Sequence, residues 1–302
     1  MSREVVNTQR VRNVLSNNTR KSFVRERTIE GGPYKLFSIY TRTMKQELEA
    51  KEPRGRRKKV STISKQRWNE HWSQKRAELK FYKNFGEGDY YGTWTHNSKF
   101  MPKRPEDFKK YKDSVLKQLQ RLYKKEGFEF RYMWFTSYQF SADETYVQRI
   151  HHHVIFSSGP SRDDIEACWS RGSGKNKKKI GRTDLKIIQP DEDGSLKSLA
   201  YYLTHQGKWD KRTWKNMQKR WSTSQNLKEP TETTNDSKWS QRKLANIGFD
   251  NGDGADVILA MFPGYKIIGD IYKKYDDERG WYVSAELLKI ENKPRKKRKG
   301  RP

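Results

Sequence analysis

Residues 149–156 have the sequence Arg-Ile-His-His-His-Val-Ile-Phe, which holds three of the six histidines in the chain. The β-branched and aromatic residues around them predict a β-strand. Because side chains alternate between the two faces of a strand, His151 and His153 share one face, about 6–7 Å apart along the strand. His152 shares the other face with apolar neighbours, so we expect it to be packed in a core. The outer two histidines can therefore converge on one metal ion.

A second informative stretch, residues 195–206, has the sequence Ser-Leu-Lys-Ser-Leu-Ala-Tyr-Tyr-Leu-Thr-His-Gln. Its apolar residues recur at helical spacing and form the predicted buried stripe: Leu196, Leu199, Ala200 and Leu203. At 100° per residue, Tyr202 lies on the flank of this stripe, whereas Tyr201 points nearly opposite to it. A residue on the flank can reach a site on a sheet below, so Tyr202 is the better candidate nucleophile. If the helix stood alone, both tyrosines would be ordinary amphipathic surface.

The segments around these two stretches alternate between strand and helix patterns. Strands are predicted at 89–95, 128–140, 147–157 and 183–189, and helices at 64–85, 105–126, 161–172 and 195–206. This alternation predicts an α+β fold, in which helices pack on one face of an antiparallel sheet.

The charge of the chain points to a polyanionic partner. Lys and Arg number 65 against 37 Asp and Glu, which gives a formal charge of +28. Such a charge repels itself unless a polyanion compensates it, and nucleic acid is the usual one. The chain also has 10 Trp, 16 Tyr and 13 Phe, and flat rings among basic residues suit single-stranded nucleic acid. A non-catalytic nucleic-acid-binding protein would explain these features, but not the histidine pair followed by a tyrosine helix.

Composition also predicts how the chain is divided. Residues 1–63 are predicted to be a basic N-terminal arm with little core, although 34–40 alternate like a strand. Residues 64–230 hold both informative stretches and form the predicted central domain. Residues 231–291 form a small C-terminal extension, and 292–302 a basic tail.

Cysteine and apolar content predict the compartment. The single cysteine, Cys168, excludes an intramolecular disulfide and suits a reducing cytoplasm. The first twenty residues lack the apolar core of a secretory signal, and the longest apolar run, 257–262, is too short to cross a bilayer. We therefore expect a cytoplasmic protein with no membrane partner.

A His-x-His strand followed by a helix with a tyrosine resembles the HUH endonucleases. More closely, the chain resembles the rolling-circle replication initiators of bacterial phages and mobile elements. Three blocks match that pattern in order: 86–95, 149–156 and 200–205, and segments 220–226 and 262–265 also look similar. The resemblance covers roughly residues 85–291. It implies a ferredoxin-like or RRM-like antiparallel sheet, the HUH endonuclease fold, with the histidines on a central strand.

The resemblance also implies an activity, nicking and rejoining of single-stranded origin DNA in the bacterial cytoplasm. Tyr202 would attack a phosphodiester, hold the 5′ phosphate covalently and free a 3′ hydroxyl for the host DNA polymerase. Two imidazoles and one oxygen donor suit Mn²⁺ or Mg²⁺. The sequence has no Gly-x-x-x-x-Gly-Lys-Ser/Thr motif, so a host helicase is the expected unwinding partner. A single-tyrosine relaxase or transposase would share this chemistry.

Two positions depart from the pattern of the relatives. Where they often carry a glutamate before the histidine motif, this chain has Ser137, and Gln139 on the same face is the candidate third metal ligand beside His151 and His153. Where they usually carry a lysine three residues after the tyrosine, this chain has His205. A zinc-binding structural site is disfavoured because no fourth nitrogen or sulfur ligand stands nearby.

The remaining candidate residues are predicted either to support the nucleophile or to bind DNA. Tyr201, His205 and Lys208 are predicted to support the nucleophile. The residues predicted to bind DNA are Arg149, Lys177, Lys178, Arg220 and Trp221.

Overall fold

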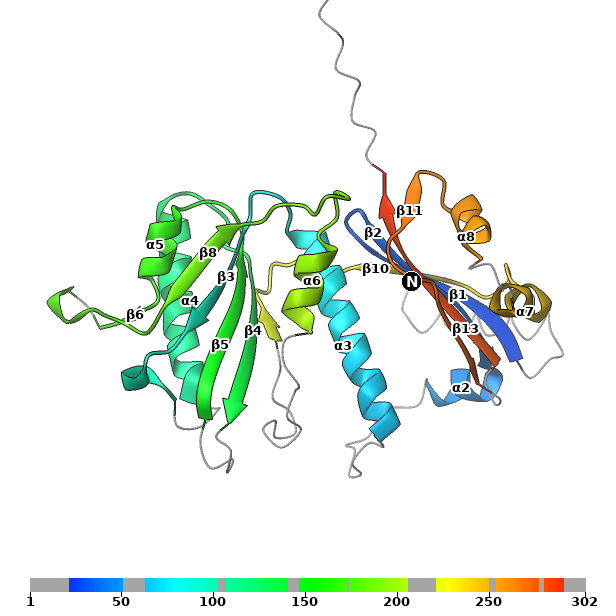
Figure 1. Cartoon of the computed structure of the whole chain (residues 1–302), viewed down its shortest axis with the longest axis horizontal. Helices are drawn as coiled ribbons and strands as arrows, with labels where there is room; N and C mark the ends of the chain where they lie inside the picture. Colours follow the sequence, from blue (N-terminus) through cyan, green and yellow to red (C-terminus); the bar gives the residue numbers. More distant parts are fainter. Residues whose placement is uncertain are drawn as a thin grey trace, which may run out of the picture. The chain divides into compact units, whose positions relative to one another are not determined.

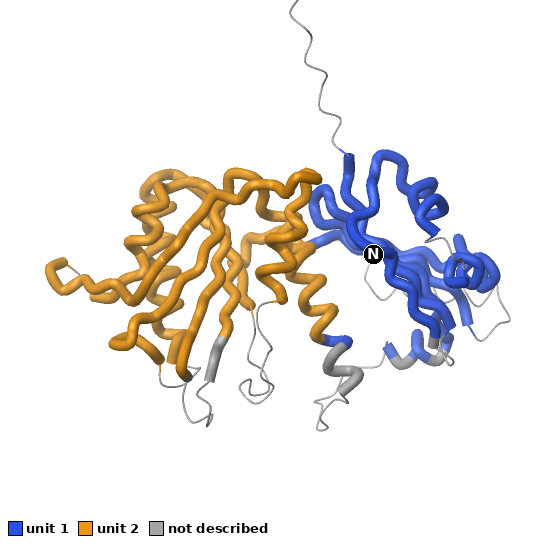
Figure 2. The backbone as a smooth tube through the Cα atoms, viewed as in Figure 1, with its two compact units in different colours: residues 1–69, 230–302 blue, residues 70–229 orange. Residues whose placement is uncertain are grey.

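The computed structural model describes residues 22–50, 63–102, 107–140, 147–172, 174–205, 221–249, 254–276 and 280–290. The chain divides into two compact units (Figure 2). Unit 1 comprises Met1–Asn69 and Pro230–Pro302, and unit 2 comprises Glu70–Glu229. Unit 2 nearly coincides with the predicted central domain. Both units have antiparallel sheets with helices, which confirms the predicted α+β class.

Unit 2 is built on a five-stranded antiparallel sheet in the order β8-β3-β5-β4-β9, so the histidine strand β5 lies in the middle. Its strands are β3 (Tyr90–Thr95), β4 (Tyr132–Phe140), β5 (Val147–Phe156), β8 (Thr183–Ile187) and β9 (Trp221–Thr223). Its helices are α3 (Ile63–Asn84, which begins in unit 1), α4 (Phe108–Lys125), α5 (Arg162–Ala167) and α6 (Lys197–Thr204). Short elements complete it: 3-10 turns η1 (Ser98–Phe100) and η3 (Gly174–Asn176), and a hairpin of β6 (Ser170–Arg171) and β7 (Lys178–Lys179).

Helices lie on both faces of this sheet, as Figure 1 shows. α4 and α5 cover the face that carries His152, whereas α3 and α6 lie over the face that carries His153. The expectation that helices pack on one face alone is therefore wrong. The strand pattern explains the difference, because Met133, Phe135 and Ile155 point to the His153 face and are buried there, so this face also needs a cover.

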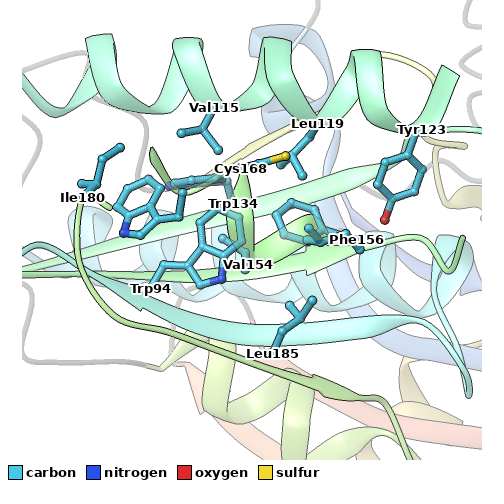
Figure 3. Close-up of a cluster of buried hydrophobic side chains, with 12 residues drawn as sticks. Trp94, Val115, Leu119, Tyr123, Trp134, Val154, Phe156, Cys168, Ile180 and Leu185 are labelled. Atoms are coloured by element: carbon cyan, nitrogen blue, oxygen red, sulfur yellow. The ribbon is translucent and has the colours of Figure 1, made fainter. Parts of the chain in front are cut away.

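The core between the sheet and α4 is rich in tryptophan (Figure 3). Val115, Leu119 and Tyr123 recur every four residues along α4 and are fully buried. They pack on Trp94 of β3 and Trp134 of β4, the two strands that flank β5, and these two rings meet edge to face with centroids 5.7 Å apart. Burial of these large rings on one face favours this register of the strands beneath α4, because a shift by one residue would turn them to the other face.

Unit 1 has its own sheet, in the order β10-β1-β2-β13-β11, with β12 also paired to β13. Its strands are β1 (Ser22–Gly31), β2 (Tyr34–Thr43), β10 (Thr231–Asn235), β11 (Tyr265–Ile267), β12 (Tyr272–Asp276) and β13 (Gly280–Lys289). Its helices are α2 (Met44–Glu49), α7 (Gln241–Phe249) and α8 (Ala255–Met261). Leu244 and Ile247 of α7 and Ile258 of α8 pack on Phe37 and Ile39 of β2.

The predicted N-terminal arm is wrong for residues 22–49, which form β1, β2 and α2. β1 and β2 make a hairpin closed at Gly32, whose φ of 61° suits a two-residue turn. β1 also pairs with β10 and β2 with β13, so the predicted C-terminal extension completes the same sheet. The basic run at 53–59 and the tail at 292–302 lie outside the described residues.

The ion pairs of Arg25 show how the basic segment that forms β1 can be part of a buried sheet. Arg25 is 6% exposed, and its guanidinium binds both carboxylate oxygens of Asp236 at 2.8 and 2.9 Å and Glu47 at 3.0 Å. Burial alone would lower the pKa of Arg25, but these carboxylates raise it. The guanidinium therefore stays charged and ties β1 to α2 and to the end of β10.

None of the helices in the described ranges is long and apolar enough to cross a membrane.

Candidate functional site

His151 and His153 lie on the same face of the central strand, as predicted. His153 is 4% exposed, and its Nδ1 lies 3.2 Å from Oγ1 of Thr93, directly across on β3. His151 is half-buried, and burial together with the charge of Arg149 lowers its pKa below 6.5. His151 is therefore neutral at neutral pH, which is the form of imidazole that ligates a metal.

The structure brings Tyr202 over His153. The rings of Tyr202 and His153 meet edge to face, with centroids 5.2 Å apart, although the residues are 49 positions apart in sequence. α6 buries Leu196, Ala200 and Leu203, and its Tyr202 side chain stays 47% exposed. A phenol half-exposed beside a buried imidazole can be reached by a ligand from solvent.

Tyr201 points elsewhere. It is 58% exposed, and its ring stacks on His205 with centroids 3.9 Å apart and planes 13° from parallel. Of the two adjacent tyrosines, Tyr202 is the one that contacts His153, as the helical pattern predicts.

The C-terminal end of α6 is fixed to α3 by a buried carboxylate. Glu78 is 4% exposed and accepts a hydrogen bond of 2.9 Å from Oγ1 of Thr204. Lys75 also lies 2.9 Å from Glu78, and Nδ1 of His205 lies 3.8 Å from it. These contacts hold the turn of α6 that follows Tyr202, so they limit the rotation of the tyrosine about the helix axis.

A cleft of about 780 Å³ opens beside Tyr202, between α6 and strands β3 and β8. Thr93 and Tyr202 line it together with the cationic side chains Arg162 and Lys186. Lys186 lies 3.3 Å from Asp184, but both side chains are more than half exposed, so this pair holds the lysine only weakly. Asp184 and Asp191 also line the cleft, so its charged residues are balanced, and Arg162 and Lys186 are the ones that suit a phosphodiester.

Gly92 keeps β8 close to β3 at this cleft. A Cβ at Gly92 would lie 2.4 Å from the carbonyl oxygen of Asp184, so no larger residue fits without moving β8.

His152 is packed on the opposite face, as predicted, and is fully buried. Its Nδ1 accepts hydrogen bonds from Trp134 Nε1 at 3.2 Å and Thr136 Oγ1 at 3.1 Å, so its Nε2 carries the proton. That Nε2 donates to Nε2 of His96 at 2.9 Å, and Nδ1 of His96 donates to the carbonyl of Phe100. Every polar atom of this neutral pair has a partner.

The third metal ligand is placed only by backbone register. Ser137 lies directly opposite His151, and Gln139 lies opposite Arg149, on the same face of the sheet. Among the described residues, no three His, Cys, Asp or Glu side chains gather as a metal cage. A site here would therefore use the two imidazoles with an amide or hydroxyl oxygen, a mixed set that Mn²⁺ or Mg²⁺ accepts.

The predicted DNA-binding residues lie in different places. Arg149 is exposed beside the site, and Lys177 and Lys178 are exposed on the β6–β7 hairpin. Trp221 lies opposite Phe135, on the face that carries His153, and its Nε1 lies 3.3 Å from Ser73 Oγ of α3. Lys208 and Arg220 fall outside the described residues.

Two functional residues are missed by sequence reasoning. Thr93 shows no local signal beyond its place in an aromatic strand, and its contact with His153 depends on the pairing of β3 with β5. Glu78 carries the signal of an acidic residue on the predicted helix 64–85, but its partner Thr204 is 126 positions away.

Comparisons of the chain with family models, with curated proteins and with solved structures give no match.

Proposed function

We propose that the protein is a metal-dependent DNA-nicking enzyme of the rolling-circle initiator type, with Tyr202 as nucleophile. The observation that carries the proposal is the contact between Tyr202 and His153, with ring centroids 5.2 Å apart on the His151 face of the central strand. Burial of His153 does not require contact with a tyrosine, and the half-exposed Tyr202 on α6 does not require contact with a histidine. Their meeting beside a cleft lined by Arg162 and Lys186 supports transesterification of a phosphodiester, which needs a nucleophile next to groups that bind phosphate.

The bond changes balance without a further reactant. The phenolic oxygen of Tyr202 forms a bond to phosphorus, and the bond between phosphorus and the 3′ oxygen breaks. The phenolic proton passes to water, and the 3′ oxygen takes up a proton to leave as a hydroxyl. The 5′ phosphate stays on Tyr202, so the reverse reaction can rejoin the strand without an energy source.

His151, His153 and Gln139 would hold the Mn²⁺ or Mg²⁺ ion. A bound divalent ion supplies polarisation of a non-bridging phosphate oxygen and neutralises developing charge. Thr93 lies 3.2 Å from Nδ1 of His153 and would orient this imidazole toward the ion. Arg162 and Lys186 of the cleft bind the neighbouring phosphates and hold the strand across Tyr202.

The proposal is tested by incubating the full chain with labelled single-stranded DNA and Mn²⁺, and by looking for a protein–DNA adduct that survives denaturation. EDTA should prevent adduct formation. Peptide mapping should locate the DNA on Tyr202. Binding of DNA with no adduct under any divalent ion would favour the non-catalytic binding protein instead.

Tyr202→Phe and Tyr201→Phe are matched variants, because each removes one hydroxyl from one of two adjacent tyrosines on α6. Tyr202→Phe should keep DNA binding and lose the adduct. Tyr201→Phe should keep most of the activity, because the ring that stacks on His205 remains. A DNA-linked peptide modified at Tyr201 would overturn the assignment of the nucleophile.

A further inference from the structure

A narrow β-hairpin projects from unit 2 between α5 and β8. Its strands β6 and β7 pair antiparallel and are joined through the turn η3. Figure 1 shows it extending away from the sheet, beyond α4 and α5. The hairpin adds almost nothing to the core, so its presence needs another explanation.

The root of the hairpin is fixed to the end of β3. Trp169 and Ile180 flank it, and each is 1% exposed. The Ile180 amide donates to the Trp169 carbonyl at 3.0 Å, and Trp169 Nε1 donates to the carbonyl of Thr95 at 2.8 Å. Thr95 is the residue directly opposite His151, so the hairpin is anchored at the same end of the sheet as the histidine pair.

The charge on the hairpin has one sign. Between residues 170 and 182 the chain has six basic residues and no acidic one. Arg171 lies directly opposite Lys178, and like charges at opposed positions destabilise a strand pair. In the part of the chain that the structure describes, Lys175, Lys177 and Lys178 are exposed and form no ion pair. A bound polyanion would relieve this repulsion.

The exposed side chains of the hairpin lack aromatic rings. They are Arg, Lys and Asn, with glycine, whereas binding of single strands depends on rings that stack with bases. Lysine and arginine on a ribbon instead suit phosphates spaced along a duplex. The major groove of B-DNA is about 12 Å wide and admits a two-stranded β-ribbon, whereas the major groove of A-form RNA is too narrow.

We propose that the β6–β7 hairpin is a separate binding site for double-stranded B-DNA. The root of the hairpin packs on the His152 face, at the same end of the sheet as the histidine pair. This inference rests on the proposed function only in one respect, that the duplex would flank the strand that is nicked. The substrate class would then be a junction, with duplex DNA on the hairpin and the adjoining single strand at Tyr202.

The test compares two triple variants of the full chain that remove equal charge. One is Lys175→Gln, Lys177→Gln and Lys178→Gln; the other, a control, is Lys117→Gln, Lys124→Gln and Lys125→Gln on the exposed side of α4. Fluorescence anisotropy measures their affinity for duplex DNA, single-stranded DNA and duplex RNA over a range of salt. All six lysines are exposed, and equal melting temperatures would verify that both variants fold.

The hairpin variant should lose about tenfold or more in affinity for duplex DNA, and its slope of log K against log salt should fall by about 2–3, since each phosphate contact contributes about 0.9. Its affinity for single-stranded DNA should change less than about twofold. The control variant should bind all three probes like the unmodified chain.

Equal losses on duplex and single-stranded DNA would overturn the proposal, as would equal losses in the α4 control. An equal loss on duplex RNA would overturn the assignment to B-form DNA. The readout is binding, so it does not depend on Tyr202. If no adduct forms but the hairpin variant loses duplex binding, the proposed nicking function fails while this inference stands.

Discussion

At the scale of single residues, three consecutive histidines have three different environments. His151 is half-buried beside Arg149, His153 lies under Tyr202, and His152 is enclosed on the other face. The alternation of strand side chains predicts this division without any knowledge of the fold. What it does not predict is the partner of each ring, because Thr93, Tyr202 and His96 come from segments far away in the sequence.

We expect His151→Ala and His153→Ala to fold and to lose nicking by more than about 100-fold, since even residues that only orient metal ligands contribute about 10–100-fold. His152→Ala should instead destabilise the fold by about 2–4 kcal/mol, because it leaves a cavity and removes the partners of Trp134 and His96. Urea unfolding measures the stability, and the denaturation-resistant adduct measures nicking. An EDTA-insensitive reaction would contradict the metal role.

His96 makes stability depend on pH. Burial lowers its pKa from 6.5 to about 4, although the hydrogen bond to Phe100 opposes this. The unfolded chain therefore binds more protons than the folded chain between about pH 4 and 6.5, so stability should rise with pH through this window. A shift of this size corresponds to about 3 kcal/mol. His96→Gln, which does not titrate, should flatten the slope of unfolding free energy against pH; an unchanged slope would contradict the assignment.

At the scale of elements, the end of α6 depends on one hydroxyl. Thr204→Val keeps the β-branched shape but removes the bond to Glu78, which leaves a buried carboxylate with one fewer donor. We expect a loss of about 1–3 kcal/mol in stability and slower nicking, because the turn after Tyr202 loosens. Thr204→Ser retains the hydroxyl and serves as the matched control. Equal nicking rates in the two variants would show that this anchor does not position Tyr202.

Most elements between residues 63 and 205 are predictable because their signals are local, but the predicted helix 161–172 ends at Ala167 and residues 170–171 form strand β6 instead. Ser161 caps α5 through its bond to the Asp164 amide, and Gly127, with φ of 80°, follows the end of α4. The cleft beside α6 is not predictable, since it depends on how closely β8 approaches Gly92. Helices on both faces are missed because an apolar strand residue does not show which helix will cover it.

At the scale of the whole molecule, unit 1 could not be read from composition. Arg25 and Arg27 make β1 look like part of a basic arm, yet their partners Asp236 and Glu232 are more than 200 positions away. A short segment of sequence contains the basic residues but not the distant carboxylates that neutralise them. The two ends of the chain build one sheet, and unit 2 is a continuous insertion between them.

Arg25→Ala tests the integrity of unit 1. It leaves Asp236 and Glu47 buried without their guanidinium, a change that usually costs about 3–5 kcal/mol. Arg42 still pairs with Glu47 at 2.7 Å, so the loss should fall mainly on Asp236. Hydrogen exchange should show faster opening of β1 and β10, with β5 and α4 protected as before. Arg27→Ala is the comparison, because its bridge to Glu232 is more exposed and should contribute less than about 1 kcal/mol.

Under the proposed function, the charge of the whole chain would determine how it encounters DNA before a strand is cleaved. Residues 293–302 contain seven basic residues and no acidic one, so deleting them should remove phosphate contacts that carry no sequence information. Counterion release then predicts a shallower slope of log K against log salt, by up to about 0.7 per lost contact on single strands. Cleavage of a short single strand at low salt should continue, because Tyr202 and the histidine pair remain intact. An unchanged slope would show that these residues do not meet the phosphates, and a lost adduct would show that they take part in the site itself.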